Sequence, residues 1–252
     1  MLAVILLIWQ QQRFTDVFGN PFSPDKVRQT PAISPDLGPR HQLTYQQWVD
    51  ILKQEAKVAS EQPPENLSIL TGDSLTLWFP PQFLPDDRNW LNQAISGESS
   101  DGLLKRLDLF DSTQPEIIFV MIGINDLIRG VSDPVILENQ RQIMTYLRKT
   151  HPKAEIVVQS ILPHGDKEAT WEGREKLLTI PNSRIRQLNQ QLQSTASTVG
   201  VKYLDLYPLF TNEQGNLRSE FTTDGLHLNP TGYVVWRTAL QMYSNMELGN
   251  GE

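Results

Sequence analysis

The 252-residue sequence contains no cysteine, which excludes disulfides, thiolate metal sites and a cysteine nucleophile. Basic residues are also scarce, because 22 Lys and Arg stand against 29 Asp and Glu, a formal net charge of −7. Proteins that bind nucleic acids usually present a basic face to the phosphates, so we expect no nucleic-acid partner. No apolar run reaches the length of about 18 residues that indicates a membrane-spanning helix. The length suits one large domain, or one domain with an extension.

The amino terminus carries an apolar run, MLAVILLIW at residues 1–9. It is too short to cross a bilayer, and it lacks the preceding basic residue and the following small-residue cleavage site of a signal peptide. One interpretation is the end of a longer anchor that begins upstream, which predicts membrane anchoring or export to the cell envelope. The other is an apolar strand or helix packed on the core, which is compatible with the cytoplasm. Both interpretations fit the sequence.

Residues 10–66 hold seven of the 17 prolines. Proline fixes φ and removes a hydrogen-bond donor, so most of this stretch is predicted to be an extended tether. Residues 44–60 interrupt it with a helical pattern, in which Thr44 can cap the helix and Gln47 completes a capping box. We expect this helix to dock on the domain that follows. The helical pattern places five residues on one side of it, namely Trp48, Ile51, Leu52, Glu55 and Val58.

The organisation changes after residue 66, where short apolar runs alternate with amphipathic stretches. Runs without polar alternation are typical of parallel strands covered on both faces, and strand–helix repetition predicts a three-layer α/β/α sandwich. The expected strands are 67–70, 90–95, 117–122, 156–161 and 201–206, and the expected helices are 103–110, 134–149, 180–199 and one beginning at Pro230. The predicted domains are therefore an N-terminal segment with tether and docking helix (1–66), a sandwich domain (67–246) and a tail (247–252).

Four polar segments follow predicted strands or precede the last helix, in the loops where such folds carry function. They are TGDSL at 71–75, SGES at 96–99, GIND at 123–126 and DGLHL at 224–228. The three-residue spacing of Asp224 and His227 allows the carboxylate to reach Nδ1 of the ring, which leaves the other nitrogen free to take a proton from Ser74. Gly97 can expose its N–H to a substrate oxygen, and Asn125 offers a neutral donor. Each segment alone is typical of a turn or cap, but the ordered set indicates a serine hydrolase.

These four blocks resemble those of the SGNH hydrolase superfamily, the GDSL esterase and lipase group, over about residues 66–246. The resemblance implies that Ser74 is the nucleophile, His227 the general base and Asp224 its orienting group. It also implies an oxyanion hole formed by the N–H groups of Ser74 and Gly97 and the side chain of Asn125. The implied fold is a five-stranded parallel sheet in flavodoxin-like order, with no cofactor and no metal. Ala94 departs from the glycine of many members, and we expect that change to affect packing more than catalysis.

Several other residues receive structural interpretations. We expect Asp73 to bond within its turn and Asp126 to brace the third block. His164 follows the fourth predicted strand, where it could touch substrate, but the favoured interpretation is a solvated loop residue. His41 and His151 are interpreted as surface residues. The aromatic segment 78–81 either lines an acyl or sugar site or packs under its loop, and the charged loop 163–179 is a candidate cover for the site.

The predicted activity is hydrolysis of a small-molecule carboxylic ester through an acyl-enzyme on Ser74. No long apolar lid pattern is present, so a short acyl chain or an acetylated sugar is favoured. The alternatives are an acyltransferase that moves acetyl groups onto a glycan, a lysophospholipase-type lipid acylhydrolase, and a non-catalytic binding module that keeps the fold.

Overall fold

The computed structural model describes residues 43–248, and a compact unit begins at Leu43. The apolar run 1–9, the tether up to residue 42 and His41 lie outside the described residues, as does most of the predicted tail. The predictions made for those segments therefore stay predictions.

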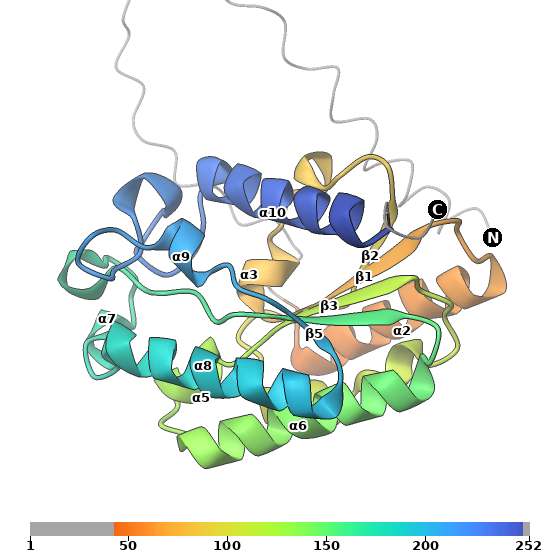
Figure 1. Ribbon diagram of the computed structural model, residues 1–252, viewed down its shortest axis with the longest axis horizontal. Coiled ribbons are helices and arrows are strands. Elements are labelled where there is room, and N and C mark those ends of the chain that lie inside the picture. Colours follow the sequence, from red (N-terminus) through yellow and green to blue (C-terminus); the bar gives the residue numbers. More distant parts are fainter. Residues whose placement is uncertain (1–42, 249–252) are drawn as a thin grey trace, which may run out of the picture. The chain divides into compact units, whose positions relative to one another are not determined.

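Five parallel strands form one sheet in the order β2-β1-β3-β4-β5. This is the flavodoxin-like order, and it confirms the predicted fold (Figure 1). Parallel order places the carboxyl ends of β1, β2 and β3 side by side at one edge of the sheet. The strands are β1 (Leu67–Gly72), β2 (Asn89–Asn92), β3 (Ile117–Met121), β4 (Glu155–Gln159) and β5 (Lys202–Leu204).

Helices cover both faces of the sheet, with α10 on one face and α2, α6 and α8 on the other (Figure 1). Side chains of β3 alternate between the two apolar cores, because Ile118 and Val120 pack with α6 and α8 whereas Ile117 and Phe119 pack with α10. The long helices are α2 (Tyr45–Glu61), α6 (Asp133–Thr150), α8 (Asn182–Val199) and α10 (Pro230–Leu248). Shorter helices are α3 (Ser74–Leu77), α4 (Ser100–Leu104), α5 (Ile124–Ile128), α7 (Arg174–Leu177) and α9 (Tyr207–Phe210), with 3-10 turns η3 (Pro81–Phe83), η4 (Leu107–Phe110), η5 (Asp166–Glu168) and η6 (Ser219–Phe221).

Helix α2 begins with the capping box that the sequence predicts. The Thr44 hydroxyl accepts the N–H of Gln47, and the Gln47 side chain accepts the N–H of Thr44 at 2.8 Å. The helix buries Trp48 and Leu52 against Ile95, which follows β2. The compact unit therefore includes α2 as well as the sheet.

Several sequence predictions differ from the structure in the extent or the burial of an element. The strand expected at 90–95 ends at Asn92, because the Asn92 side chain accepts the Ala94 N–H at 3.1 Å and turns the chain. The helix expected at 103–110 is divided into α4 and η4. Strands β2 and β5 are partly exposed because they are the edges of the sheet, whereas β1 and β3 are buried throughout, as predicted. Among the described helices, none has both the length and the apolar character needed to cross a membrane.

Candidate active site

Ser74 lies at the carboxyl end of the central strand β1, as the first residue of α3. Strand β1 ends at Gly72, where an added Cβ would lie 2.0 Å from the carbonyl oxygen of Met121 on β3. Only glycine therefore fits at this strand exit. Asp73 caps α3, since its carboxylate accepts the Leu75 N–H at 3.1 Å. The strand and the cap together fix the position of the Ser74 hydroxyl.

The loop before α10 brings His227 to Ser74. The ring Nε2 of His227 lies 3.3 Å from the Ser74 Oγ, although the two residues are 153 positions apart. On the other side of the ring, Nδ1 lies 2.8 Å from the Asp224 Oδ2. Because the carboxylate is an acceptor, it fixes the proton on Nδ1 and leaves Nε2 as the acceptor that faces the Ser74 hydroxyl.

Asp224 is held by its own loop. Its Oδ1 accepts the backbone N–H groups of Leu226 at 2.9 Å and His227 at 2.8 Å, which leaves Oδ2 for the imidazole. Burial opposes ionisation of this carboxyl, but the hydrogen bonds from the ring and backbone of His227 outweigh it and lower the pKa of Asp224. The group is therefore an anion at neutral pH and can stabilise a charged imidazole.

Trp78 packs on the histidine. Its ring centroid lies 4.3 Å from that of His227, with the two planes tilted by 39°. An aromatic ring at this distance packs on the imidazole and limits its movement. The segment 78–81 was expected either to line a site or to pack under its loop, and the structure divides it between the two. Phe79, the next residue, is buried in the core against Tyr233 and Trp236.

Gly97 and Asn125 follow the strands on either side of β1. Gly97 has a φ of +74°, which favours glycine, and an added Cβ there would meet no described atom within 4 Å. Asn125 lies in the first turn of α5, and its Nδ2 is buried without a hydrogen-bond partner among the described residues. Buried donors are almost always bonded, so this one is explained most simply as a donor for a bound oxygen atom. Arg129, the residue that follows α5, donates to the Gly97 carbonyl at 2.5 Å and so links the two loops.

His164 is not the solvated loop residue that we expected, since only 1% of it is exposed. Its Nδ1 accepts the Asp166 N–H at 3.0 Å, and its Nε2 therefore donates to the Ile180 carbonyl at 2.6 Å. Both nitrogens are used to close the loop, so His164 has a structural role. His151 is likewise buried, stacked on Phe110, although we expected it at the surface. In both cases aromatic or backbone partners distant along the chain decide the burial.

The loop 163–179 packs against the loop that carries Asp224. Thr170 and Trp171 donate their N–H groups to the Asp224 carbonyl at 2.8 and 2.9 Å, and Gly165 donates to the Gly225 carbonyl at 2.7 Å. Sequence reasoning missed this brace because its residues are more than 50 positions apart. It also missed Glu98 and Arg106, which form a buried ion pair beside Gly97. Glu98 lies before α4 and Arg106 lies after it, so the two residues share no helix or strand whose repeat would identify them.

The described residues hold no group of three or more His, Asp or Glu side chains placed to ligate a metal ion. The chemistry that the site offers is a hydroxyl, an imidazole and a carboxylate in hydrogen-bonding sequence. The loop after β3 adds the amide of Asn125, which has no partner among the described residues.

Known proteins share this fold and sequence pattern. A structure from Streptococcus pneumoniae, provisionally described as a platelet activating factor, superposes with a TM-score of 0.70 at 27% identity, over 79% of this chain and 93% of that one. The platelet-activating factor acetylhydrolase IB subunit alpha1 of Rattus norvegicus is 27% identical over 147 residues. The N-acylneuraminate cytidylyltransferase of Streptococcus agalactiae is 25% identical over 179 residues.

These sequence matches are partial. They cover 57% of this chain for the acetylhydrolase subunit and 71% for the cytidylyltransferase, but only 58% and 39% of those proteins. The model of the GDSL-like Lipase/Acylhydrolase family, in contrast, matches residues 68–235, which is more than half of the chain and includes the blocks of Ser74, Gly97, Asn125 and His227. The chain belongs to the GDSL-like lipase/acylhydrolase family of hydrolases.

Proposed function

We propose that the protein is a serine esterase that hydrolyses a small carboxylic ester through an acyl-enzyme on Ser74. The observation that carries the proposal is the continuous contact from the Ser74 Oγ through the His227 ring to the Asp224 carboxylate, at 3.3 and 2.8 Å. A hydroxyl that faces the free nitrogen of an oriented imidazole can be deprotonated as it attacks a carbonyl carbon.

In the first half-reaction the Ser74 Oγ forms a bond to the ester carbon while its proton passes to the His227 Nε2. The tetrahedral intermediate collapses by breaking the bond to the alcohol oxygen, which takes that proton from His227. Water then attacks the acyl-enzyme and gives its proton to the same nitrogen, and the acid leaves as Ser74 recovers its proton. Asp224 remains ionised and stabilises the imidazolium in both halves.

The negative oxygen of each intermediate is assigned to three donors, the N–H groups of Ser74 and Gly97 and the Nδ2 of Asn125. Among the described residues, that Nδ2 has no hydrogen-bond partner, which supports its assignment as a donor to the bound oxygen. A single donor of this kind contributes about 10²–10³ in rate. We therefore assign most of the stabilisation of the intermediate to this oxyanion hole.

The proposed substrate carries a short acyl group. The acetylhydrolase subunit among the relatives acts by name on an acetyl ester, which supports a small acyl group here. The Trp78 ring stands against His227 and limits the space on that side of the reacting atoms.

The test compares hydrolysis of p-nitrophenyl acetate, butyrate and octanoate by the wild type and by Ser74→Ala and Asn125→Ala proteins. We expect acetate to be the best substrate, Ser74→Ala to show no turnover above background, and Asn125→Ala to lose about 10²–10³ in kcat. Ser183→Ala, which removes an exposed hydroxyl from α8, is the matched control and should retain wild-type rates.

A fluorophosphonate probe tests the covalent step separately. Mass spectrometry should find one adduct on Ser74 in the wild type and none in the Ser74→Ala protein. Turnover or labelling that survives in Ser74→Ala would remove that residue as the nucleophile. A preference for octanoate over acetate would contradict the short acyl group while leaving the nucleophile intact.

A further inference from the structure

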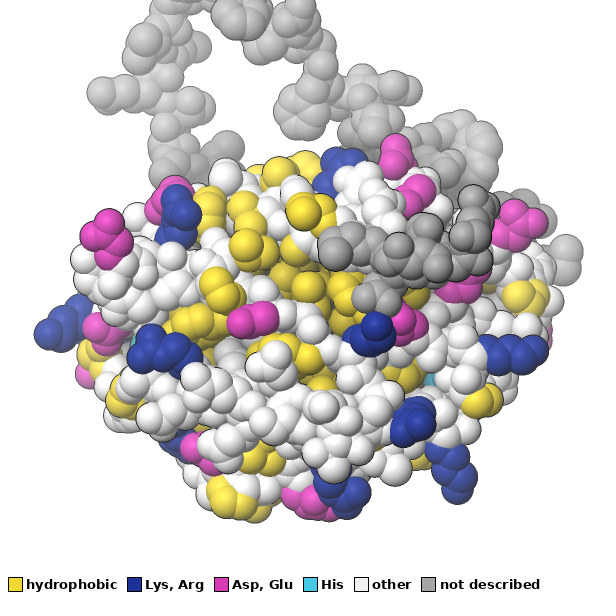
Figure 2. Space-filling view, in the orientation of Figure 1, with side chains coloured by type: hydrophobic (Ala, Val, Ile, Leu, Met, Phe, Trp, Pro, Cys, Tyr) yellow, Lys and Arg dark blue, Asp and Glu magenta, His cyan; other side chains and the backbone are white. Residues whose placement is uncertain are grey.

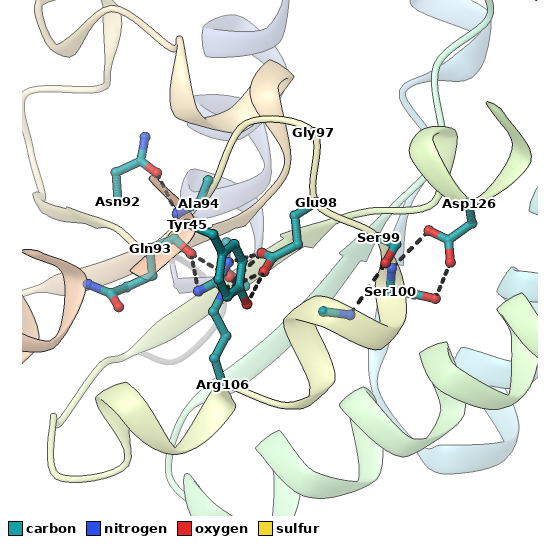
Figure 3. Close-up of polar contacts among 12 residues, drawn as sticks. Tyr45, Asn92, Gln93, Ala94, Gly97, Glu98, Ser99, Ser100, Arg106 and Asp126 are labelled. Atoms are coloured by element: carbon teal, nitrogen blue, oxygen red, sulfur yellow. Dashed lines mark hydrogen bonds and ion pairs between the residues drawn. The ribbon is translucent and has the colours of Figure 1, made fainter. Parts of the chain in front are cut away.

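A buried ion pair lies directly behind the Gly97 turn. Arg106, which lies between α4 and η4, donates from Nε to both carboxylate oxygens of Glu98 at 2.9 and 2.8 Å, and its Nη2 also bonds to Oε2 (Figure 3). The two side chains are 3% and 1% exposed. Arg106 Nη1 also donates to the carbonyl of Gln93 at 2.8 Å, so the pair is bonded to the chain on the other side of the turn.

Helix α2 completes this network although it lies before the part of the chain that the family model matches. The Tyr45 hydroxyl donates to Oε1 of Glu98 at 3.1 Å, and the Gln93 side chain donates to the carbonyl of Leu52 at 3.1 Å. Tyr45 and Leu52 lie on the same side of α2, about two turns apart. Helix α2 therefore bonds to both ends of the segment that contains Gly97, at Gln93 and at Glu98.

The network fixes a turn with Gly97 at its third position. The Glu98 N–H closes the turn on the Ile95 carbonyl at 3.3 Å, and the Ile95 N–H is bonded to the Gly72 carbonyl at the end of β1. The positive φ of Gly97 suits the third residue of a type II turn. The closing bond uses the N–H of Glu98, so the N–H of Gly97 takes no part in it. The direction of that N–H therefore depends on where Glu98 is anchored.

The Glu98 side chain packs closely against Gly102 of helix α4. An added Cβ at Gly102 would lie 3.0 Å from the Glu98 Cγ and 3.2 Å from its Oε1. A second set of hydrogen bonds holds the loop of the other proposed donor, Asn125. The Asp126 carboxylate accepts the N–H and hydroxyl of Ser100 at 2.8 and 2.6 Å (Figure 3). Asp126 is adjacent to Asn125, so the loops of both proposed donors are tied to the start of α4.

We propose that Glu98 is a positioning residue for the oxyanion hole, held by Arg106 and by Tyr45 of α2 so that the Gly97 N–H points at the reacting oxygen. The proposal rests on the function proposed above, and it makes α2 part of the catalytic apparatus. An oxyanion donor acts only when it lies about 2.7–3.1 Å from the developing charge, so a small shift of this turn lowers the rate. A buried, fully bonded charge pair has few alternative arrangements and therefore suits this task.

The experiment measures kcat, KM and the midpoint of thermal unfolding for Glu98→Gln, Glu98→Asp and Tyr45→Phe proteins. We expect Glu98→Gln to lose about 10–10² in kcat, with KM changed less than about two-fold, since the donor acts on the transition state. Glu98→Asp should recover part of that loss because it restores the charge. Tyr45→Phe removes one hydroxyl from a half-exposed side chain, so the protein folds, and kcat should fall by about two- to five-fold.

Arg88→Gln is the matched control. Arg88 is also a buried arginine in an ion pair, with its side chain 3% exposed, and it bonds to Ser68 and Glu116 near the amino ends of β1 and β3. This variant should lower the unfolding midpoint and leave kcat unchanged. If Glu98→Gln and Tyr45→Phe behave in the same way, with lower stability and wild-type kcat, the positioning role is wrong.

A double-mutant cycle tests whether Glu98 acts on the same negative oxygen as Asn125. In the Asn125→Ala background, Glu98→Gln should cost less in kcat than it costs in the wild type, because the Gly97 N–H and the Asn125 side chain are donors to one oxygen and are therefore coupled. Independent, multiplicative losses would contradict the proposal. Failure of the proposed function gives a different result, since turnover would then survive Ser74→Ala whatever Glu98 does.

Discussion

Asp73 is a buried carboxyl group beside the proposed nucleophile. It is 1% exposed, and burial raises its pKa from about 3.8 to about 7. The Leu75 N–H opposes this shift, while the nearby carboxylates of Glu98 and Asp126 add to it. The folded protein therefore holds a proton on Asp73 at pH values at which the unfolded chain has lost it.

This shift predicts a pH-dependent loss of stability. Because the folded-state pKa lies above the unfolded one, the contribution of Asp73 is fully present below about pH 4 and is lost as the pH rises to about 7. Asp73→Asn keeps the helix cap and removes the titration. Relative to this variant, the wild type should lose up to about 4 kcal/mol of unfolding free energy between pH 4 and pH 8, at about 1.4 kcal/mol for each pKa unit.

Urea denaturation of both proteins at several pH values measures this difference. Asp87→Asn changes an exposed carboxyl before β2 and serves as the control, with no comparable difference expected. A constant difference in stability between wild type and Asp73→Asn across this range would show that the two states bind protons on Asp73 equally.

At the scale of elements, the loop 163–179 is a brace for the segment that carries Asp224 and His227. The contact is close, because an added Cβ at Gly225 would lie 2.6 Å from the Cα of Ala169. Gly225 also has a φ of +85°. Substitution there therefore adds a steric conflict with a distant loop to the ordinary strain of a side chain at positive φ.

Gly225→Ala and Gly215→Ala separate these two effects. The φ of Gly225 is +85° and that of Gly215 is +83°, so the backbone strain of a side chain is similar at both positions. An added Cβ at Gly215 would meet only the Arg186 Nη1, at 3.8 Å, and would therefore clash with nothing. Gly215→Ala should lose about 1–2 kcal/mol of stability from positive φ alone and keep wild-type turnover. Gly225→Ala should lose more stability, and its kcat should fall at least about ten-fold because Asp224 and His227 shift from Ser74.

Chemical denaturation and ester turnover of the two variants test this prediction. If the two variants have equal stability and equal turnover, the loop 163–179 adjusts to the added methyl group at residue 225 without moving Asp224. In that case the loop would cover the segment without positioning it.

At the scale of the whole molecule, the sheet separates two apolar cores, and α10 alone among the long helices covers one of them (Figure 1). Trp236 of α10 is fully buried there, and its Nε1 donates to Gln159 of β4 at 2.7 Å. On the visible face, charges of both signs are scattered, and apolar side chains gather in the upper half, where α10 lies (Figure 2). The helix is thus apolar on its inner side and partly apolar outside, as the exposed Val234 and Met242 show.

Trp236→Ala should lower the unfolding free energy by about 3–5 kcal/mol, because it leaves a cavity and an unpaired Gln159 side chain. That loss is a large part of the 5–15 kcal/mol typical of a folded domain. Met242→Ala removes a side chain that is 59% exposed on the same helix, and it should change stability by about 0.5 kcal/mol or less. Urea denaturation measures both, and equal losses would contradict the division of α10 into a packed and an unpacked side.

The sequence by itself determined the alternation of strands and helices, the parallel α/β sandwich and the capping box of α2. It also determined the Asp224–His227 contact, since that contact joins residues three positions apart within one loop. These features depend on periodicity and on short-range hydrogen bonds, which the order of residues encodes directly. The polar blocks at strand ends, together with the block before the last helix, then indicated as an ordered set that Ser74 and His227 would meet.

Only the tertiary structure decided which distant groups share an environment. It buried His164 with its ring bonded to the Ile180 carbonyl, exposed the edge strands β2 and β5, and placed Glu98, Arg106 and Tyr45 together behind Gly97. The contact between Tyr45 and Glu98 joins residues 53 positions apart. Burial and charge pairing depend on the surfaces that close around a side chain, and those surfaces come from segments whose own local sequence gives no indication of one another.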